Sequence, residues 1–487
     1  MSKLIKNELI KIFKKKSIYI TLIIMLGFII LVNCLNKYSL SSISTSTYYS
    51  DSYIDYAKEQ IGNLDPSNAS DTNLYIEYKS EIDIYDLMQK YEDGSWQQSI
   101  ISSKIASLIN EKNTYMYGSE KDDVRVADIN KEIDGYIEKL NADDWRYFAN
   151  QDLDDANELL STLEEQKNNT TDKQELQNLE VQIENAKISK EVAQYRLDKN
   201  IKYGTDYMNI ALNEYEQSCM SIAQYDADMS SKDYGERQDY NNNIETRETS
   251  KYIIETGQDV NKTGDLRANL ETFLNQYGLF IIVIIVMIAG TIVSEEFNKG
   301  TVKLLLVRPY SRRQILMAKF ITVLIMTVFA IVAILIMEII VGGVILGFDS
   351  LSVPVVRYDF NENQLIQMNV FQYLGITIIA QLPVYILLAT LAFALSTIFS
   401  NSAVAIAIPL LGYMSAEIIN ALIIQYKIGF MQLFVSMNWD FTQYLFGNLP
   451  KMDGMNAIFS AVICVVYFLV MMIPTFIFFQ KRNIKNI

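Results

Sequence analysis

Histidine is absent from this chain of 487 residues, and cysteine and proline are scarce, with 3 and 7 residues. Without histidine, the chain has no Ser-His-Asp or Cys-His catalytic system and no histidine ligand for a metal. The cysteines, Cys34, Cys219 and Cys464, have neither CxxC nor zinc-site spacing, and a disulfide framework is excluded. The chain also lacks a G-x-x-x-x-G-K-S/T phosphate loop and any EF-hand spacing among its aspartates. We therefore expect no metal site, no bound cofactor and no ATP hydrolysis by a phosphate loop of its own.

Charge divides the chain into two compositions. Residues 39–275 hold 47 acidic and 23 basic residues, a net charge of −24. The remainder is +9 and strongly apolar, although the formal charge of the whole chain is −15 and 50% of its residues are hydrophobic. Such a division rules out one uniform globular domain and a wholly disordered chain. It also excludes nucleic acid as a partner of the polar block, because phosphate binding needs a basic surface.

Six apolar windows are long enough to cross a bilayer, for which about 20 residues must span roughly 30 Å of hydrocarbon. A polar stretch of three residues, 400–402, separates the fourth window from the fifth. These two windows together are too long for a single span, so we predict two helices joined by a tight turn. The predicted spans are 17–35, 277–293, 315–346, 371–399, 403–424 and 457–479.

Lysine and arginine gather at one end of the predicted spans. The segment 1–16 has six lysines, the flank between the second and third spans has six bases, and the tail 480–487 has three. Because cytoplasmic flanks carry the excess of these residues, we predict a plasma-membrane protein with both termini in the cytoplasm and residues 39–275 outside the cell. A lipoprotein signal ending at Cys34 is the alternative. Since Asn33 is not the small residue that such a signal needs before its cysteine, we expect an uncleaved anchor.

The acidic block has mostly helical periodicity. Apolar residues recur at alternating spacings of three and four in two stretches, for which we predict helices over 143–167 and 172–200. A polar turn separates them, and Thr171 with Gln174 fits a capping box that opens the second helix. We therefore predict an all-α integral membrane protein, with six transmembrane helices and a mainly helical, coiled-coil-like extracellular domain. Its acidic surface either recognises a cationic ligand or keeps a helical stalk soluble, and we favour the second interpretation.

The polar segment 294–313 lies between the second and third predicted spans. It begins with an acidic pair, continues with Gly-Thr and an apolar run, and ends with a proline and two arginines. This pattern predicts a short helix leaving the membrane, a glycine break, and a second short helix at the interface that the proline ends. A compact element of this kind suits docking into the groove of a partner.

This order of residues resembles the permease subunits of ABC-2 type transporters, in which the loop contacts a separate ATPase. The segment 1–16 is similar to the interfacial helix that precedes the first span in that family, because its apolar residues share one helical face among lysines. The resemblance covers 1–36 and 276–487, whereas many such permeases have only a short loop in place of 39–275. It implies an ATPase-coupling role for Glu295, Glu296, Gly300, Thr301, Leu304, Leu305, Pro309, Arg312 and Arg313.

The resemblance also implies a function. The chain would be a transporter subunit rather than an enzyme, exporting an amphipathic peptide, toxin or lipid-like compound, as in relatives linked to antimicrobial-peptide resistance. Its partners would be a second permease copy, in a homodimer or heterodimer, membrane lipid, and nucleotide-binding ATPase subunits that hold ATP and Mg. One alternative is a mechanotransmitter, against which the six spans count because such relatives usually have four. The other is a membrane-anchored extracellular receptor or stalk that transports nothing.

Two acidic residues, Glu338 and Glu417, fall inside predicted spans, where charge is costly and often marks a transport pathway. We expect Glu417 to face a translocation cavity or a subunit interface. A snorkelling or hydrogen-bonded structural glutamate remains the alternative. Glu338 lies toward the outer end of its span, from which its side chain could simply reach the membrane interface.

Overall fold

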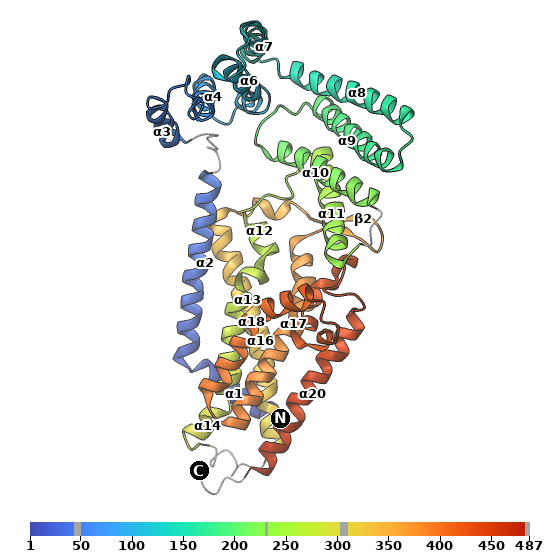
Figure 1. The fold of residues 1–487 in the computed structure, drawn as a ribbon. Helices are drawn as coiled ribbons and strands as arrows, with labels where there is room; N and C mark the ends of the chain where they lie inside the picture. The colour runs from blue at the N-terminus through green and yellow to red at the C-terminus, as the bar shows by residue number, and fades with distance from the viewer. Residues whose placement is uncertain (43–49, 229–231, 302–309, 483–487) are drawn as a thin grey trace. The chain divides into compact units, whose positions relative to one another are not determined.

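The computed structural model describes residues 1–42, 50–228, 232–301 and 310–482, and the chain folds into two compact units (Figure 1). The first, here called the membrane unit, combines Met1–Ser39 with Val260–Ile487. The second, the inserted unit, is Leu40–Asp259. The predicted polar block 39–275 is longer than the inserted unit, because α12 (Leu266–Glu271) buries Leu266 and Leu270 in the core of the membrane unit.

The membrane unit is built almost entirely from helices. The prediction of six membrane-spanning helices is confirmed, since six helices among the described residues are long and apolar enough to cross a bilayer. These are α2 (Lys16–Ser42), α13 (Phe273–Thr291), α16 (Arg312–Leu346), α17 (Val370–Phe399), α18 (Ser402–Gln425) and α20 (Ala457–Lys481). The shorter elements are α1 (Ser2–Phe13), α14 (Ser294–Asn298), α19 (Val435–Asn438) and the 3₁₀ turns Asp349–Ser352, Gly429–Leu433 and Phe441–Gly447.

Polar residues set where the long helices begin. Ser311 caps α16 and Asn369 caps α17, each in a capping box with a glutamine three residues later. Ser400 adopts a left-handed conformation with φ 54° after α17, and Asn401 then accepts hydrogen bonds from the first amides of α18. The tight turn between the fourth and fifth spans therefore needs only these two residues.

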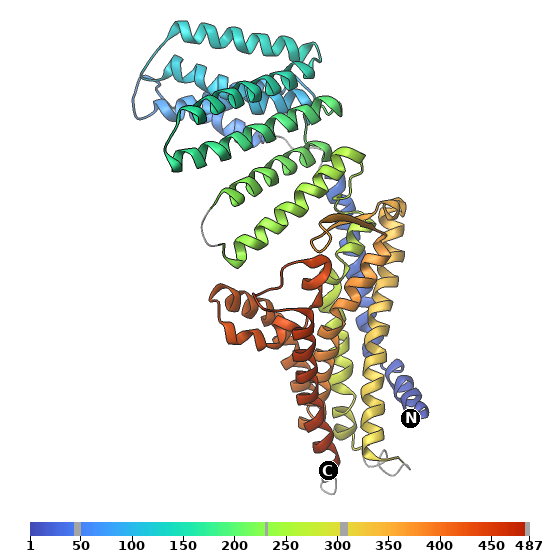
Figure 2. The same cartoon turned by 90° about the vertical axis from the view of Figure 1, so that its right-hand side faces the viewer.

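Helix α13 forms the centre of the membrane unit. It packs against α16, α17 and α18, and 67% of its most apolar window is buried, against 22% for α2 and 17% for α18. The strands β1 (Val355–Asp359) and β2 (Gln364–Met368) pair antiparallel with Val355 opposite Met368. This hairpin between α16 and α17 was not predicted. Figure 2 shows α16 as one long helix, with α1 beside its first turns.

The inserted unit contains helices around several small cores. Its largest core joins residues from α4 to α8, including Ile100, Ile105 and Phe148. The helices are α3 (Asp51–Ile61), α4 (Thr72–Met88), α5 (Trp96–Ile100) continued by a π-helical turn Ile101–Ile105, α6 (Ala106–Tyr117), α7 (Asp123–Asn141), α8 (Trp145–Asn169), α9 (Lys173–Asp198), α10 (Tyr207–Ala227) and α11 (Tyr234–Thr256).

The predicted helical hairpin of this unit corresponds to α8 and α9. Leu163 on α8 packs against Leu179 and Ile183 on α9. The regularly spaced apolar residues of each helix therefore face the other helix, as predicted. The predicted capping box of Thr171 with Gln174 is wrong. Asp172 is the cap instead, because its carboxylate accepts hydrogen bonds from the amides of Gln174 and Glu175.

Candidate functional site

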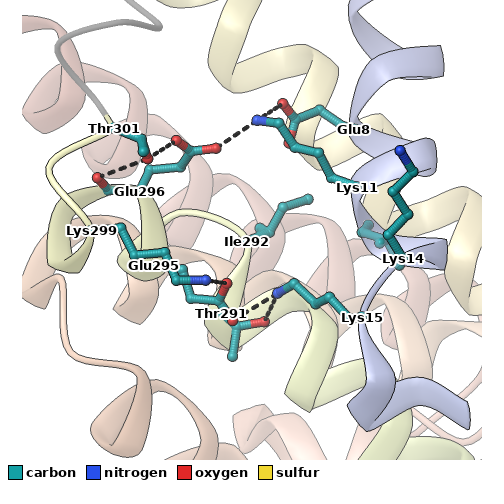
Figure 3. A pocket seen from close by; sticks show the side chains of 11 residues that line it. Glu8, Lys11, Lys14, Lys15, Thr291, Ile292, Glu295, Glu296, Lys299 and Thr301 are labelled. Carbon is teal, nitrogen blue, oxygen red and sulfur yellow. Dashed lines mark hydrogen bonds and ion pairs between the residues drawn. The ribbon is translucent and has the colours of Figure 1, made fainter.

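A charged pocket of about 460 Å³ lies where α1, the end of α13 and α14 meet in the membrane unit (Figure 3). It combines four lysines with three glutamates, and its apolar lining includes Ile12 of α1 and Ile292, the residue that follows α13. The lining residues are Glu8, Lys11, Ile12, Lys14, Lys15, Thr291, Ile292, Glu295, Glu296, Lys299 and Thr301. Three of the predicted coupling residues, Glu295, Glu296 and Thr301, are thus brought together with the N-terminal segment.

Glu296 is the centre of this network. Its Oε1 lies 2.7 Å from Lys11 Nζ and 3.4 Å from Lys319 Nζ. Its Oε2 accepts a hydrogen bond of 2.5 Å from Thr301 Oγ1. The carboxylate therefore ties α1, α14, α16 and the turn at Thr301 to a single point.

Lys319 on α16 is almost completely buried, with 2% of its surface exposed. Its ammonium group lies 2.7 Å from Glu8 Oε2 and donates a hydrogen bond of 3.0 Å to the backbone carbonyl oxygen of Ile292. A buried ammonium group is stable only when charged and hydrogen-bonding partners replace its water. Glu8, Glu296 and the end of α13 supply those partners.

Glu295 makes a second, more exposed link to α1. Its Oε1 lies 2.7 Å from Lys15 Nζ, and its Oε2 lies 3.2 Å from Lys299 Nζ. Lys15 also donates a hydrogen bond of 3.2 Å to Thr291 Oγ1 at the end of α13. The two adjacent acids thus face two different lysines of the N-terminal segment.

The network keeps its acids ionised. Burial acts to raise the pKa of Glu296, but Lys319, Lys11 and Thr301 outweigh it and lower the pKa to about 2. Burial also opposes ionisation of Glu295, whose pKa is nevertheless lowered by Lys15 and Lys299. The pKa of Lys11 is raised, since its carboxylate partners Glu296 and Glu8 exceed the opposing effect of burial. These groups are therefore fixed charges near neutral pH rather than proton carriers.

Local structure places α1 in this network. One face of α1 is buried through Leu4, Glu8 and Ile12, as expected of an amphipathic helix. Phe13 packs edge-to-face on Phe329 of α16 with ring centroids 5.1 Å apart. The same helix therefore contributes both apolar contacts and the salt-bridging residues Glu8 and Lys11.

The other predicted coupling residues have different positions. Gly300 has φ 67°, a conformation that favours glycine, and a side chain there would meet open space. Leu304, Leu305 and Pro309 lie outside the described residues. Gly300 therefore serves the turn after α14 through its backbone rather than through packing.

Arg312 belongs to a second cluster, at the last turn of α20. Its guanidinium donates to the backbone carbonyl oxygens of Gln480 and Arg482, at 2.9 and 2.8 Å. Arg482 in turn donates to Thr397 O and Ser400 Oγ, and its guanidinium lies 4.2 Å from the ring centroid of Phe297. Arg312 thus joins α16 to α17 and α20, while Arg313 is exposed.

Sequence reasoning missed Glu8, Lys319 and Arg482 as parts of the site. Lys319 and Arg482 were noted only as basic flanks. A signal was present for Lys319, because a lysine several residues inside an apolar helix needs a partner. No local pattern identifies Glu8 as that partner, since the two residues are joined only by the fold.

The two intramembrane acids are not brought together. Glu338 is fully buried on α16, so the alternative in which it reaches the membrane interface is wrong. It accepts hydrogen bonds from Tyr277 Oη at 2.6 Å, Asn33 Nδ2 at 3.1 Å and Asn269 Nδ2 at 3.3 Å. Glu417 is exposed on α18 and has no hydrogen bond or ion pair with the part of the chain that the structure describes.

The comparison with protein families matches residues that lie mostly in the membrane unit. Residues 243–485 match the model of a family described as proteins of unknown function, DUF2705. Over 209 residues the chain is 33% identical to the "Uncharacterized protein YhcI" of Bacillus subtilis, which is 43% of this chain and 65% of that relative. Over 235 residues it is 24% identical to the "Uncharacterized membrane protein YdbK" of the same organism, covering 48% of this chain and 88% of the relative.

No solved structure matches this chain. The match to the first of these relatives spans just under two thirds of that protein's own length. This chain has six candidate spans among its described residues and is similar to a protein named as a membrane protein. It is therefore a multi-pass membrane protein.

Proposed function

We propose that this chain is the permease subunit of an ATP-driven exporter, coupled to separate ATPase subunits. In this proposal it lies in the plasma membrane with both termini in the cytoplasm and residues 39–275 outside. It moves or expels an amphipathic peptide, toxin or lipid-like compound. Binding and hydrolysis of ATP with Mg belong to the partner, because the chain has no phosphate loop.

One observation supports this proposal above the others. Lys11 of α1 binds Glu296, and Lys15, two residues after α1, binds Glu295; both acids lie at the start of the segment between the second and third spans. An amphipathic helix and a loop that are distant in sequence therefore form one surface at one end of the span bundle. A force applied to that surface reaches three helices together through Lys319, rather than one loose loop.

We propose that the acids act in ATPase coupling indirectly. Both carboxylates are engaged by lysines of the same chain, so in our proposal they hold the docking surface in shape. Contact with the ATPase then falls to exposed basic side chains, such as Lys14 in the same pocket and Arg313 in the first turn of α16. Basic groups at an interface rim steer an acidic partner and set its orientation.

Glu417 supports the presence of a second permease copy. An exposed carboxylate on a membrane helix is costly when it faces lipid. Only 17% of the most apolar window of α18 is buried within one copy, so this helix has room for a neighbour. We propose that α18 and Glu417 face either the second copy or the translocation cavity that the two copies enclose.

The test is to purify the tagged full-length chain from membranes of its native cells and to measure vanadate-sensitive ATP hydrolysis. Because the chain has no phosphate loop, such activity has to come from an associated subunit. We expect activity with the wild type and loss of most of it with Lys11→Gln/Lys15→Gln, which releases α1 from α14. The matched control is Lys90→Gln/Lys121→Gln, two exposed lysines of the inserted unit. Absence of ATPase activity from the wild-type preparation, or equal activity in both variants, contradicts the proposal.

A further inference from the structure

Helix α16 carries one buried charged residue near each of its ends. Lys319 is 2% exposed and Glu338 is fully buried. At 1.5 Å per residue the two residues are about 28 Å apart along the helix axis. Helix α16 is continuous from Arg312 to Leu346, and no proline interrupts it. The two charged groups are therefore fixed to one rigid element.

The Lys319 end contacts the proposed docking surface. Lys319 binds Glu8 of α1, Glu296 of α14 and the carbonyl oxygen of Ile292. A displacement of α1 or α14 therefore has to move Lys319 or break these contacts. Since a buried ammonium group cannot lose its partners cheaply, displacement of α16 is the easier outcome.

The Glu338 end contacts the two chain segments that flank the inserted unit. Asn33 lies on α2, which leads into that unit at Leu40, and Asn269 lies on α12, just after the unit ends at Asp259. Both asparagines donate to the Glu338 carboxylate, and Asn269 also donates to Asn33 Oδ1 at 3.1 Å. The inserted unit is thus joined to the membrane unit by two segments that Glu338 holds together.

Two further contacts tighten this junction. Asn36 of α2 donates to Asn269 Oδ1 at 2.8 Å, and Tyr277 of α13 donates to Glu338 Oε2. Gly342, one turn after Glu338, allows α2 and α12 to come close. A Cβ at this position would lie 2.8 Å from a methyl carbon of Leu266 and 3.0 Å from Asn33 Oδ1.

We propose that Glu338 is a positioning residue that transmits displacement of α16 to both segments flanking the inserted unit. Asn33, Asn269 and Tyr277 all donate to this one carboxylate, so α2, α12 and α13 share a single acceptor on α16. A shift of Lys319 at one end of the rigid helix then repositions α2 and α12 together at the other. Only the source of that shift, an ATPase, rests on the proposed function.

The experiment measures amide hydrogen exchange by mass spectrometry on the full-length protein in lipid nanodiscs, without ATP or a partner. We expect Glu338→Gln to raise exchange about tenfold in peptides from both 31–38 and 260–272, since it replaces a charged acceptor of several hydrogen bonds. Lys319→Gln should raise exchange in the same two regions, although it lies at the opposite end of α16. The double variant should match Glu338→Gln alone in those regions. Once the hydrogen bonds to Glu338 are weakened, a shift of α16 no longer reaches α2 and α12, so the Lys319 change has no further effect there.

A role confined to local stability gives a different pattern. Lys319→Gln would then affect only α1, α14 and the start of α16, or the two effects would add in the double variant, and either result overturns the proposal. Unchanged exchange of α17 and α20 serves as the check on folding. If Glu338→Gln does not fold, Tyr277→Phe takes its place in the same comparison, since it removes only one of the donors.

Glycine variants give a matched control for crowding. Gly342→Ala should loosen both flanking segments, because a methyl group there meets Leu266 and Asn33. Gly375→Ala on α17 adds the same methyl group with no atom within 4 Å and should leave both segments unchanged. Equal effects of the two variants overturn the assignment of the junction. Because no ATPase is present, failure of the permease proposal leaves this result intact.

Discussion

The two units of this chain bury different kinds of polar side chain. Every buried polar residue that the structure describes in the inserted unit is uncharged, as Asn113 and Asn209 are, although this unit carries most of the acidic residues. The charge of the inserted unit therefore lies at its surface. The buried charged side chains found among the described residues belong to the membrane unit, and they are Glu8, Asp265, Arg267, Lys319 and Glu338.

This difference separates two uses of charge. Lys58 and Asp86 of the inserted unit lie 3.5 Å apart with about half of each side chain exposed, and a pair of this kind stabilises a protein by about 0–1 kcal/mol. Such a surface favours the interpretation in which acids keep the helices soluble. A buried charge, by contrast, forces neighbouring elements to supply partners, so its contacts define which helices stay together.

The largest effect that we expect comes from Lys319→Met. The change removes the buried cation from Glu8 and Glu296 and leaves them only the exposed Lys11 as a shared partner, and loss of one partner from a buried ion pair costs about 3–5 kcal/mol. The free energy of unfolding of the membrane unit should fall by that amount, as measured by denaturant titration in detergent micelles. Unfolding followed by far-UV circular dichroism would report it.

Lys58→Met provides the comparison in the inserted unit. It removes a lysine from an exposed pair, and we expect a change of less than about 1 kcal/mol. Similar losses for the two variants would mean that burial does not distinguish the two units in the way described.

The helices of both units could be predicted from sequence because their signal is local. Twenty apolar residues in a row identify a span such as α13, and spacings of three and four identify the seam between α8 and α9. The hairpin of β1 and β2 escaped prediction, because strands of five residues between two long helices give little periodic signal. The cap at Asp172 was placed one residue early, since Thr171 and Asp172 are both good capping residues.

The site could be predicted only in part. The acidic pair Glu295 and Glu296 stood out because of its place after a span, but its partners could not be named. Lys11 contacts Glu296, and Lys319 contacts Glu8, only because α1 folds back against α16. For Glu338, the cost of charge in a membrane pointed to a special role. Its donors on α2, α12 and α13 come from three distant parts of the chain.

Lowering the pH should reduce the free energy of unfolding of the membrane unit by an amount between those of the largest and smallest effects. The pKa of Glu296 falls from an ordinary value of 4.5 to about 2 in the fold, so its ionised form stabilises the native state. This contribution is fully present above pH 4.5 and is lost as pH falls toward 2. We expect about 3 kcal/mol of stability to disappear over that interval in the membrane unit, measured by denaturant titration at each pH.

Glu296→Gln should remove this part of the pH dependence. Glu180→Gln changes an exposed glutamate of the inserted unit that pairs with Lys167, and should leave the acid profile of the membrane unit as in the wild type. A profile that Glu296→Gln does not alter would assign the acid sensitivity to other carboxylates.

The smallest effect concerns the start of α9, where two adjacent residues compete for the capping role. Asp172 accepts hydrogen bonds from the amides of Gln174 and Glu175, at 2.9 Å each, so Asp172→Ala should cost the inserted unit about 1 kcal/mol. Thr171→Ala removes the residue that the sequence favoured and should cost only a few tenths. Thermal unfolding of the two variants, together with amide hydrogen exchange of α9, shows which of the two residues caps the helix. A larger loss for Thr171→Ala would restore the capping box expected from sequence, and would place the start of α9 one residue earlier than in the structure.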